Sequence, residues 1–169
     1  LEAHIVHDEQ GGFRRERRCE DQVFALYDML RRRKRANKDT YLMFVDFRKA
    51  FDTVNRNLLW GKLKSIGVEP KLIRLTRSLY DGHQAQVRLN GELSPVFPVN
   101  VGVKQGCVLS PDLYKVFVND LIPCLNACRT GVALEEVTLS LLLFADDLVM
   151  ISDSAEGLQK QAHALAQWC

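Results

Sequence analysis

The sequence lacks an excess of charge of either sign, because 23 lysine and arginine residues are balanced by 21 aspartate and glutamate residues, for a formal net charge of +2. Attraction of the whole chain to nucleic acid is therefore not indicated, and any basic surface has to be local. Hydrophobic runs of membrane-spanning length are also missing, which argues against a membrane protein. The 5 cysteines are odd in number and show no paired spacing, so a disulfide framework is not expected and a reduced, intracellular setting is favoured.

What is present is a mixture of helical and strand patterns over 169 residues, a length that suffices for one domain with a substantial core. Apolar residues at helical spacing predict an amphipathic helix from Cys19 to about Asn37. The nearly continuous apolar stretch from Tyr41 to Phe47 predicts a strand covered on both faces. Further helices are predicted at residues 58–66, at 70–80, from Ser110 onward, and after a capping box of Asp153 and Glu156.

Two predicted hairpins complete this order. The first is centred on Asn90-Gly91, a dipeptide that tolerates positive φ angles and is typical of tight turns between strands. The second joins residues 139–144 to 148–151 and carries two carboxylates at its tip. The mixed order of helices and strands predicts an α+β fold with an antiparallel sheet packed on helices.

Asp146 and Asp147 are the most informative residues because they interrupt two apolar runs. Ionised carboxylates in apolar surroundings are costly unless they are paired or bound to a metal ion. Asp46 closes the earlier predicted strand, so three carboxylates meet at one edge if the two elements are neighbours in one sheet. A hard divalent cation such as Mg²⁺ would relieve their repulsion. The alternative is an ordinary exposed turn, since aspartate tolerates turn conformations well.

Paired magnesium ions, roughly 3.5 to 4 Å apart, are the arrangement that serves in-line phosphoryl and nucleotidyl displacement. One ion activates the attacking hydroxyl, and the other stabilises the leaving oxygen. The convergence of carboxylates therefore predicts chemistry on nucleotides.

Three segments in order along the chain resemble the palm motifs of reverse transcriptases. They are DFRKAFDTVN at residues 46–55, GVKQGCVLSP at residues 102–111 and FADD at residues 144–147. Upstream, QGGFR at residues 10–14 with DQ at 21–22 resembles the segment that precedes the palm in the enzymes of non-LTR (LINE-type) retrotransposons. The resemblance implies a polymerase palm with part of the fingers, in which residues 1–40 form a helical segment on the fingers side and residues 41–169 form the palm.

For the metal site, the resemblance implies that Asp46 and Asp146 bind two Mg²⁺ ions, with Asp147 as the third carboxylate and a backbone carbonyl from Phe47. Without the resemblance, Asp146 and Asp147 have an ordinary explanation in an exposed turn, whereas an aspartate at the end of an apolar strand, as at Asp46, is unexpected.

For the substrates, the resemblance implies that Phe51 occupies the space of a nucleotide 2′-hydroxyl and so favours deoxynucleotides, with a core aromatic as the alternative. Gln105 and Gly106 would contact the incoming nucleotide and the template, although Gln-Gly in a loop is also ordinary turn chemistry. Arg14 is expected to contact nucleic acid because it falls in the upstream segment. The basic run that ends the first helix faces either phosphate or solvent.

The implied function is RNA-directed DNA polymerisation, with an RNA template, a DNA primer and deoxynucleoside triphosphates as partners. A nuclear or cytoplasmic location follows from the resemblance alone, and no protein partner is implied. The thumb is expected to lie beyond Cys169, so this segment alone is not expected to polymerise. Two alternatives stay open: a decayed or domesticated palm that only binds nucleic acid or a partner, and a polymerase that copies RNA into RNA.

Overall fold

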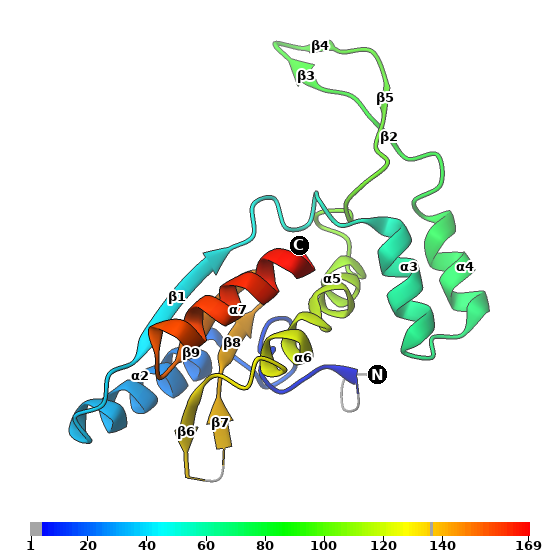
Figure 1. Cartoon of the computed structure of the whole chain (residues 1–169). Coiled ribbons are helices and arrows are strands. Elements are labelled where there is room, and N and C mark those ends of the chain that lie inside the picture. Colours follow the sequence, from blue (N-terminus) through cyan, green and yellow to red (C-terminus); the bar gives the residue numbers. More distant parts are fainter. Residues whose placement is uncertain (1–4, 136) are drawn as a thin grey trace. The chain divides into compact units, whose positions relative to one another are not determined.

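The computed structural model describes residues 5–135 and 137–169 (Figure 1). The chain forms two units: unit 1 comprises Leu1–Arg48 and Val118–Cys169, and unit 2 comprises Lys49–Phe117. These boundaries do not coincide with the predicted division at residue 40, and the assignment of segments to fingers and palm stays a prediction. Both units contain helices and antiparallel strands, as predicted for an α+β chain.

Unit 1 is built on a three-stranded antiparallel sheet in the order β1-β9-β8. The strands are β1 (Tyr41–Asp46), β8 (Leu141–Phe144) and β9 (Asp147–Ser152). The register of β1 on β9 places Asp46 opposite Asp147. Strands β8 and β9 form the predicted hairpin, but its turn is Ala145-Asp146. Asp147 is therefore the first residue of a strand and not part of the tip.

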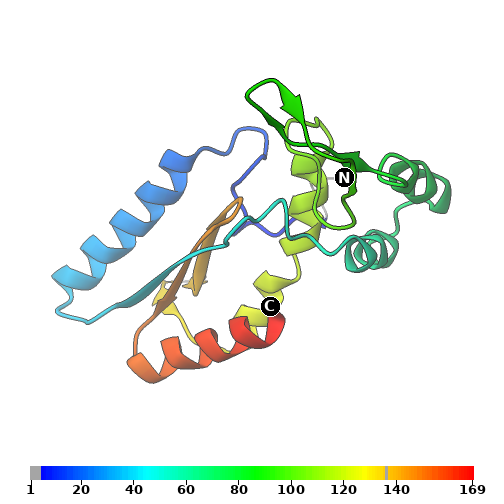
Figure 2. The same ribbon diagram turned by 90° about the horizontal axis from the view of Figure 1, so that it is seen from above.

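Two helices cover opposite faces of this sheet, α2 (Cys19–Arg35) on one side and α7 (Ala155–Trp168) on the other (Figure 2). The helix predicted from Cys19 is thereby confirmed. Its only buried side chain, Met29, packs with Leu142, Val149 and Ile151 of the hairpin. Because β-strand residues alternate between faces, the carboxylates of Asp46 and Asp147 share the α2 face of the sheet with these core residues.

Strand β1 is an edge strand, and the prediction that it is covered on both faces is wrong. Tyr41 is 39% exposed and Phe44 is 72% exposed. The sheet order explains the difference, because α2 packs over β8 and the core lies beneath the central and far strands. An apolar run cannot by itself distinguish a central strand from an edge strand.

The start of α7 also differs from the prediction by one residue. Ser154 has an extended backbone, and its Oγ accepts a hydrogen bond of 3.1 Å from the backbone N–H of Gly157. Ser154 is therefore the N-cap residue, and the predicted capping box of Asp153 and Glu156 is wrong. The rest of unit 1 contains α6 (Leu121–Asn126) and a hairpin of β6 (Val132–Leu134) and β7 (Val137–Leu139).

Unit 2 contains α3, α4 and most of α5, together with four short strands. The side chain of Asn55 caps α3 by accepting from the backbone N–H groups of Asn57 and Leu58, at 3.0 and 3.2 Å. Asn90 and Gly91 both have positive φ angles, 49° and 89°, and form the predicted turn. The elements are α3 (Arg56–Ser65), α4 (Pro70–Ser78), β2 (Gln84–Ala85), β3 (Arg88–Leu89), β4 (Glu92–Leu93), β5 (Phe97–Pro98) and α5 (Ser110–Val118). In the part of the chain that the structure describes, no helix is long and apolar enough to span a bilayer.

Candidate active site

Asp46 and Asp147 are directly opposed at one end of the unit 1 sheet. Asp46 is the last residue of β1, Asp147 is the first residue of β9, and the two are partners in the antiparallel register. Residues opposed in this way have Cβ atoms roughly 4.5–5.5 Å apart and side chains on the same face. Asp146 precedes Asp147 in the turn of the hairpin. Far-apart stretches of the sequence thus bring two of the predicted carboxylates together.

The three carboxylates are more exposed to solvent than the sequence suggests. Asp46 and Asp147 are exposed and Asp146 is half-buried, so the expectation of carboxylates enclosed by apolar residues is wrong. The apolar side chains on either side of the turn belong to strands and point into the core, whereas the carboxylates lie at the strand ends. Within residues 5–135 and 137–169, none of the three carboxylates forms an ion pair with a lysine or arginine. Among these described residues, no lysine or arginine neutralises the negative charge at this end of the sheet.

The donor set suits magnesium better than a metal that needs a complete protein cage. Among the described residues, no three Asp, Glu, His or Cys side chains form a group that could hold a metal ion as they stand. Mg²⁺ is usually bound through one or two carboxylates, several waters and substrate phosphates. The two opposed carboxylates of Asp46 and Asp147 fit that mode of binding. The two-ion site itself stays a prediction.

Phe47 follows Asp46, and the ring of Phe47 packs against a helix of unit 1. The ring packs edge-on against Trp168 of α7, with 6.2 Å between ring centroids. The indole N–H of Trp168 in turn donates to Asp120 at 3.0 Å. These contacts anchor the ring of Phe47 to α7; the role of its carbonyl oxygen as a metal ligand stays a prediction.

A pocket of about 300 Å³ adjoins the opposed carboxylates on the α2 face of the sheet. Its walls are mostly apolar, with Val23 and Leu26 on α2 and Phe44 and Phe144 on the sheet.

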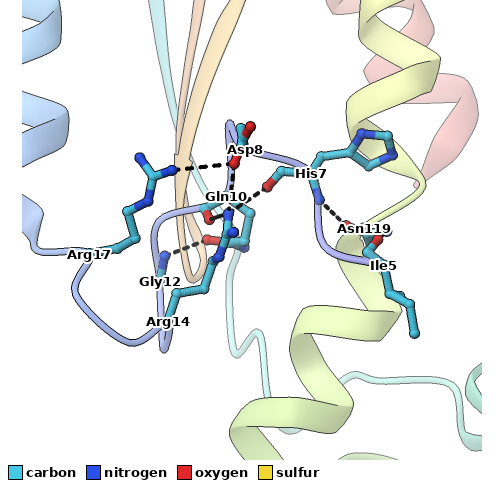
Figure 3. A network of polar contacts seen from close by, with 8 residues as sticks. All are labelled: Ile5, His7, Asp8, Gln10, Gly12, Arg14, Arg17 and Asn119. Atoms are coloured by element: carbon cyan, nitrogen blue, oxygen red, sulfur yellow. Dashed lines mark hydrogen bonds and ion pairs between the residues drawn. The ribbon is translucent and has the colours of Figure 1, made fainter. Parts of the chain in front are cut away.

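The turn that carries Asp146 is held by the N-terminal segment, a feature that the sequence did not predict. Gln10 is fully buried, and its side chain forms hydrogen bonds with Ala145 and Gly12. Figure 3 shows Gln10 within a network that includes Arg14 and Asp8. The glutamine of QGGFR could have been singled out only by its place in a segment resembling a known motif, because hydrogen bonds over 135 residues leave no local pattern.

Arg14 makes contacts within the protein. Its side chain is 13% exposed, and Nη1 donates to the carbonyl oxygens of His7 and Gln10 at 3.0 and 3.2 Å (Figure 3). The same nitrogen lies 3.5 Å from a carboxylate oxygen of Asp8. Contact of Arg14 with nucleic acid stays a prediction.

The remaining predicted site residues lie in unit 2. The ring of Phe51 is half-buried and stacks on Tyr114 of α5, with 4.9 Å between centroids and 12° between ring planes. Gln105 is exposed, and its Nε2 donates to the carboxylate of Asp52 at 3.0 Å. Gly106 is exposed with φ at 77°.

The two motif segments of unit 2 are fixed to each other by their backbones. The N–H of Gly102 donates to the carbonyl of Val54 at 2.9 Å, and the N–H of Val103 donates to the carbonyl of Phe51 at 2.8 Å. Arg56 adds three hydrogen bonds of 2.7–3.0 Å to the carbonyls of residues 99, 101 and 102, and burial lowers its pKa. Phe51 and Gln105 are thus carried by one rigid pair of loops.

The model of the family described as "Reverse transcriptase (RNA-dependent DNA polymerase)" matches residues 1–169. The chain belongs to the reverse transcriptase family. The resemblance inferred from the three motifs is confirmed, including the branch of the non-LTR retrotransposon enzymes. A chain of apo telomerase from Candida tropicalis shares 18% identity with this one at a TM-score of 0.61, over 86% of this chain and 30% of that chain. The fold is therefore the expected α+β polymerase palm with part of the fingers.

Among related sequences, a 149 kDa protein of transposon TX1 from Xenopus laevis is 27% identical over 94% of this chain. A probable RNA-directed DNA polymerase from transposon BS of Drosophila melanogaster is 30% identical over 99% of it. The RNA-directed DNA polymerase from mobile element jockey of Drosophila funebris is 35% identical over 74% of it. This reverse transcriptase segment covers 12%, 19% and 14% of those proteins, respectively.

Proposed function

We propose that this chain forms the catalytic centre of an RNA-directed DNA polymerase, which extends a DNA primer along an RNA template with deoxynucleoside triphosphates. The direct opposition of Asp46 and Asp147 carries the proposal, together with membership of the reverse transcriptase family. Two opposed carboxylates that pair with no lysine or arginine among the described residues are suited to binding divalent cations that also hold triphosphate oxygens.

In this site Asp46 and Asp147 would hold Mg²⁺, with Asp146 beside them and the carbonyl of Phe47 as a further oxygen donor. Two bound ions would supply activation of the primer hydroxyl and stabilisation of the charge on the phosphates. The 3′-hydroxyl loses its proton and attacks the α-phosphorus, so that a new P–O bond forms and the bond to the β-phosphate breaks with release of pyrophosphate. Fixed strand ends hold the carboxylates in place for this reaction.

The unit 2 residues would select and place the substrates. Phe51 would exclude a 2′-hydroxyl, and its stacking on Tyr114 would keep its ring from moving aside. Gln105 and Gly106 would contact nucleotide and template. Arg14 has N–H groups beyond Nη1 with which it would contact phosphate.

Primer extension by the protein expressed from its complete natural reading frame tests the proposal. Asp46→Asn should reduce incorporation by about 10²–10³-fold or more, since a metal-binding charge is lost with little change in shape. Asp153→Asn is the matched control, because Asp153 is exposed just after the opposite end of β9, and it should leave extension unchanged.

Equal extension by Asp46→Asn and the wild type would overturn the proposal. Binding of a template–primer by wild-type protein without any extension would instead indicate a palm that only binds nucleic acid. Incorporation of ribonucleotides in preference to deoxynucleotides would indicate an enzyme that makes RNA.

A further inference from the structure

The side chain of Gln10 is the main contact of the N-terminal segment with the turn that carries Asp146. It is fully buried. Its Oε1 accepts hydrogen bonds from the backbone N–H groups of Ala145, at 3.0 Å, and Gly12, at 2.7 Å. Its Nε2 donates to the carbonyl of Ala145 at 3.4 Å. Gln10 therefore binds both backbone polar groups of the residue that precedes Asp146.

The orientation of this amide is determined by its partners. Backbone N–H groups can only donate, so the atom that faces Ala145 N and Gly12 N has to be the carbonyl oxygen of Gln10. The amide nitrogen then faces the Ala145 carbonyl. A glutamine at this position satisfies three backbone groups in a place that water does not reach.

Ala145 needs such support because its backbone is in the left-handed region, with φ at 57°. This conformation is disfavoured for a residue with a Cβ atom. It allows the chain to turn in two residues between β8 and β9, and thereby sets where Asp146 and Asp147 lie. If Ala145 relaxed, both carboxylates would move.

The segment that carries Gln10 is itself anchored on both sides. The N–H of Gly11 donates to the carbonyl of Leu143 at 2.8 Å, and the N–H of Leu143 donates to the carbonyl of Glu9 at 2.9 Å. Figure 3 shows a second anchor, where the N–H of His7 donates to the side chain of Asn119 at 3.1 Å. The backbone on both sides of Gln10 is therefore hydrogen-bonded to other parts of unit 1, which places the Gln10 side chain at the turn.

Gly12 contributes a close approach from the same segment. A Cβ atom on Gly12 would lie 2.1 Å from the backbone nitrogen of Ala145. Only glycine leaves room for the backbone of the segment to lie directly on the turn.

We propose that Gln10 is a positioning residue for the metal site: it fixes the Ala145-Asp146 turn so that the carboxylates at the end of the sheet are held ready for divalent cations. The inference rests on the proposed function, because it assumes that these carboxylates bind metal. Gln10 does not touch metal or substrate and acts through the backbone of Ala145.

Gln10→Met tests the proposal, since methionine has nearly the same size and offers none of the three hydrogen bonds. Gln161→Met is a matched control. Gln161 is also fully buried in unit 1, and its Nε2 donates to the carbonyls of Ser140 and Ile151, away from the turn. Both variants lose buried hydrogen bonds and are expected to be destabilised, so thermal unfolding is measured for each.

Three readouts separate positioning from stability. Amide hydrogen exchange at Ala145, measured by NMR, should accelerate about 10-fold or more in Gln10→Met, in which the acceptor of that amide is lost. Binding of Mn²⁺, measured by electron paramagnetic resonance, should weaken about 10-fold. The Mg²⁺ concentration for half-maximal primer extension should rise similarly, with the KM for template–primer unchanged. Gln161→Met should match the wild type in all three.

A conservative variant provides the rescue. In Gln10→Glu, one carboxyl oxygen still accepts from Ala145 N and Gly12 N, and in the protonated form that burial favours the other oxygen donates to the Ala145 carbonyl. Exchange protection and Mn²⁺ affinity should therefore recover to within about 3-fold of the wild type. If Gln10→Met does not fold, Gln10→Asn takes its place, because its amide is one methylene too short to reach the turn.

The outcomes distinguish this inference from the function on which it rests. Wild-type protein that neither binds Mn²⁺ nor extends a primer would refute the proposed function. Wild-type protein that does both, with Gln10→Met indistinguishable from Gln161→Met in exchange and in metal affinity, would overturn the role of Gln10 alone.

Discussion

At the scale of single residues, the opposition of Asp46 and Asp147 costs stability when no cation is present. Like charges directly opposed across an antiparallel pair repel. Neither carboxylate has a lysine or arginine partner in the described part of the chain to offset the repulsion. The divalent cation proposed for this site would neutralise the pair and offset the repulsion.

The first prediction follows from this repulsion. Asp147→Asn should raise the melting temperature in chelator by about 1–3 °C, from the ~0.2–1 kcal/mol typical of opposed charges and the temperature shift expected for a chain of this size. It should also remove most of the stabilisation that millimolar Mg²⁺ gives the wild type. Differential scanning calorimetry with and without Mg²⁺ measures both effects. A variant less stable than the wild type in chelator, and equally stabilised by Mg²⁺, would show that the pair is not a cation site.

The second prediction concerns the ring of Phe51. Phe51→Ala should lower the preference for deoxynucleotides over ribonucleotides, measured as a ratio of kcat/KM values, by about 10-fold or more, because the ring no longer fills the space of a 2′-hydroxyl. Phe97→Ala, in the exposed strand β5, is the control for loss of an aromatic ring. An unchanged ratio for Phe51→Ala would mean that the ring only packs on Tyr114.

At the scale of helices and strands, the sequence predicted the elements that are determined by residues close together in the chain. The amphipathic helix from Cys19, the Asn90-Gly91 turn and the hairpin around Asp146 all follow from spacing and turn chemistry and are present. The exposure of β1 was missed because sheet order is set by pairing with β9, more than 100 residues away. The N-cap of α7 was misplaced because Asp153 and Ser154 are both good caps and only the backbone conformation distinguishes them.

In the candidate site, too, the features set by nearby residues could be predicted and those set by distant residues could not. The carboxylates could be identified from their placement beside apolar runs and from the motifs. The register places Asp46 opposite Asp147, but among the described residues no three acidic side chains form a group that could hold a metal ion as they stand. The hydrogen bonds of Gln10 with Ala145 and of Gln105 with Asp52 could not be predicted, since both join distant segments through side chains. Their partners are determined by tertiary structure and not by sequence spacing.

The third prediction concerns the contact between the motif loops of unit 2. A Cβ atom on Gly102 would lie 2.6 Å from the carbonyl oxygen of Asp52, and Gly102 has φ at 82°. Gly67 has the same φ but open space around it, so Gly67→Ala measures backbone strain alone, about 1–2 kcal/mol.

Gly102→Ala should lower the free energy of unfolding by a further ~1–3 kcal/mol because of the clash, and it should raise the KM for nucleotide by moving Gln105. Denaturant unfolding and steady-state kinetics measure the two effects, and equal losses in the two variants would show that the loops can separate freely.

At the scale of the whole molecule, the balanced net charge means that nucleic acid has to be bound by local clusters. The last turn of α2 carries four basic residues, and Arg14 lies in the segment before α2. This chain spans only 12%, 19% and 14% of the three transposon proteins described above. Template and primer binding is therefore best measured in the protein from the complete reading frame.

The fourth prediction uses the salt dependence of that binding. Arg14→Gln should reduce the slope of log K against log salt concentration by about 1, the value for one phosphate contact. Lys160→Gln, on α7, removes one positive charge from the opposite side of the sheet and should leave the slope unchanged. If Arg14→Gln lowers the melting temperature but leaves the slope unchanged, Arg14 contacts no phosphate and only stabilises the fold through its hydrogen bonds to His7 and Gln10.

The central claim is that Asp46 and Asp147 bind a divalent cation together, and anomalous diffraction from crystals grown with Mn²⁺ tests it most directly. We expect an anomalous peak between the end of β1 and the start of β9, about 2.0–2.3 Å from a carboxylate oxygen of each residue, and its loss in Asp46→Asn. Mn²⁺ bound elsewhere, or carboxylates of Asp46 and Asp147 that share no ion, would contradict the account.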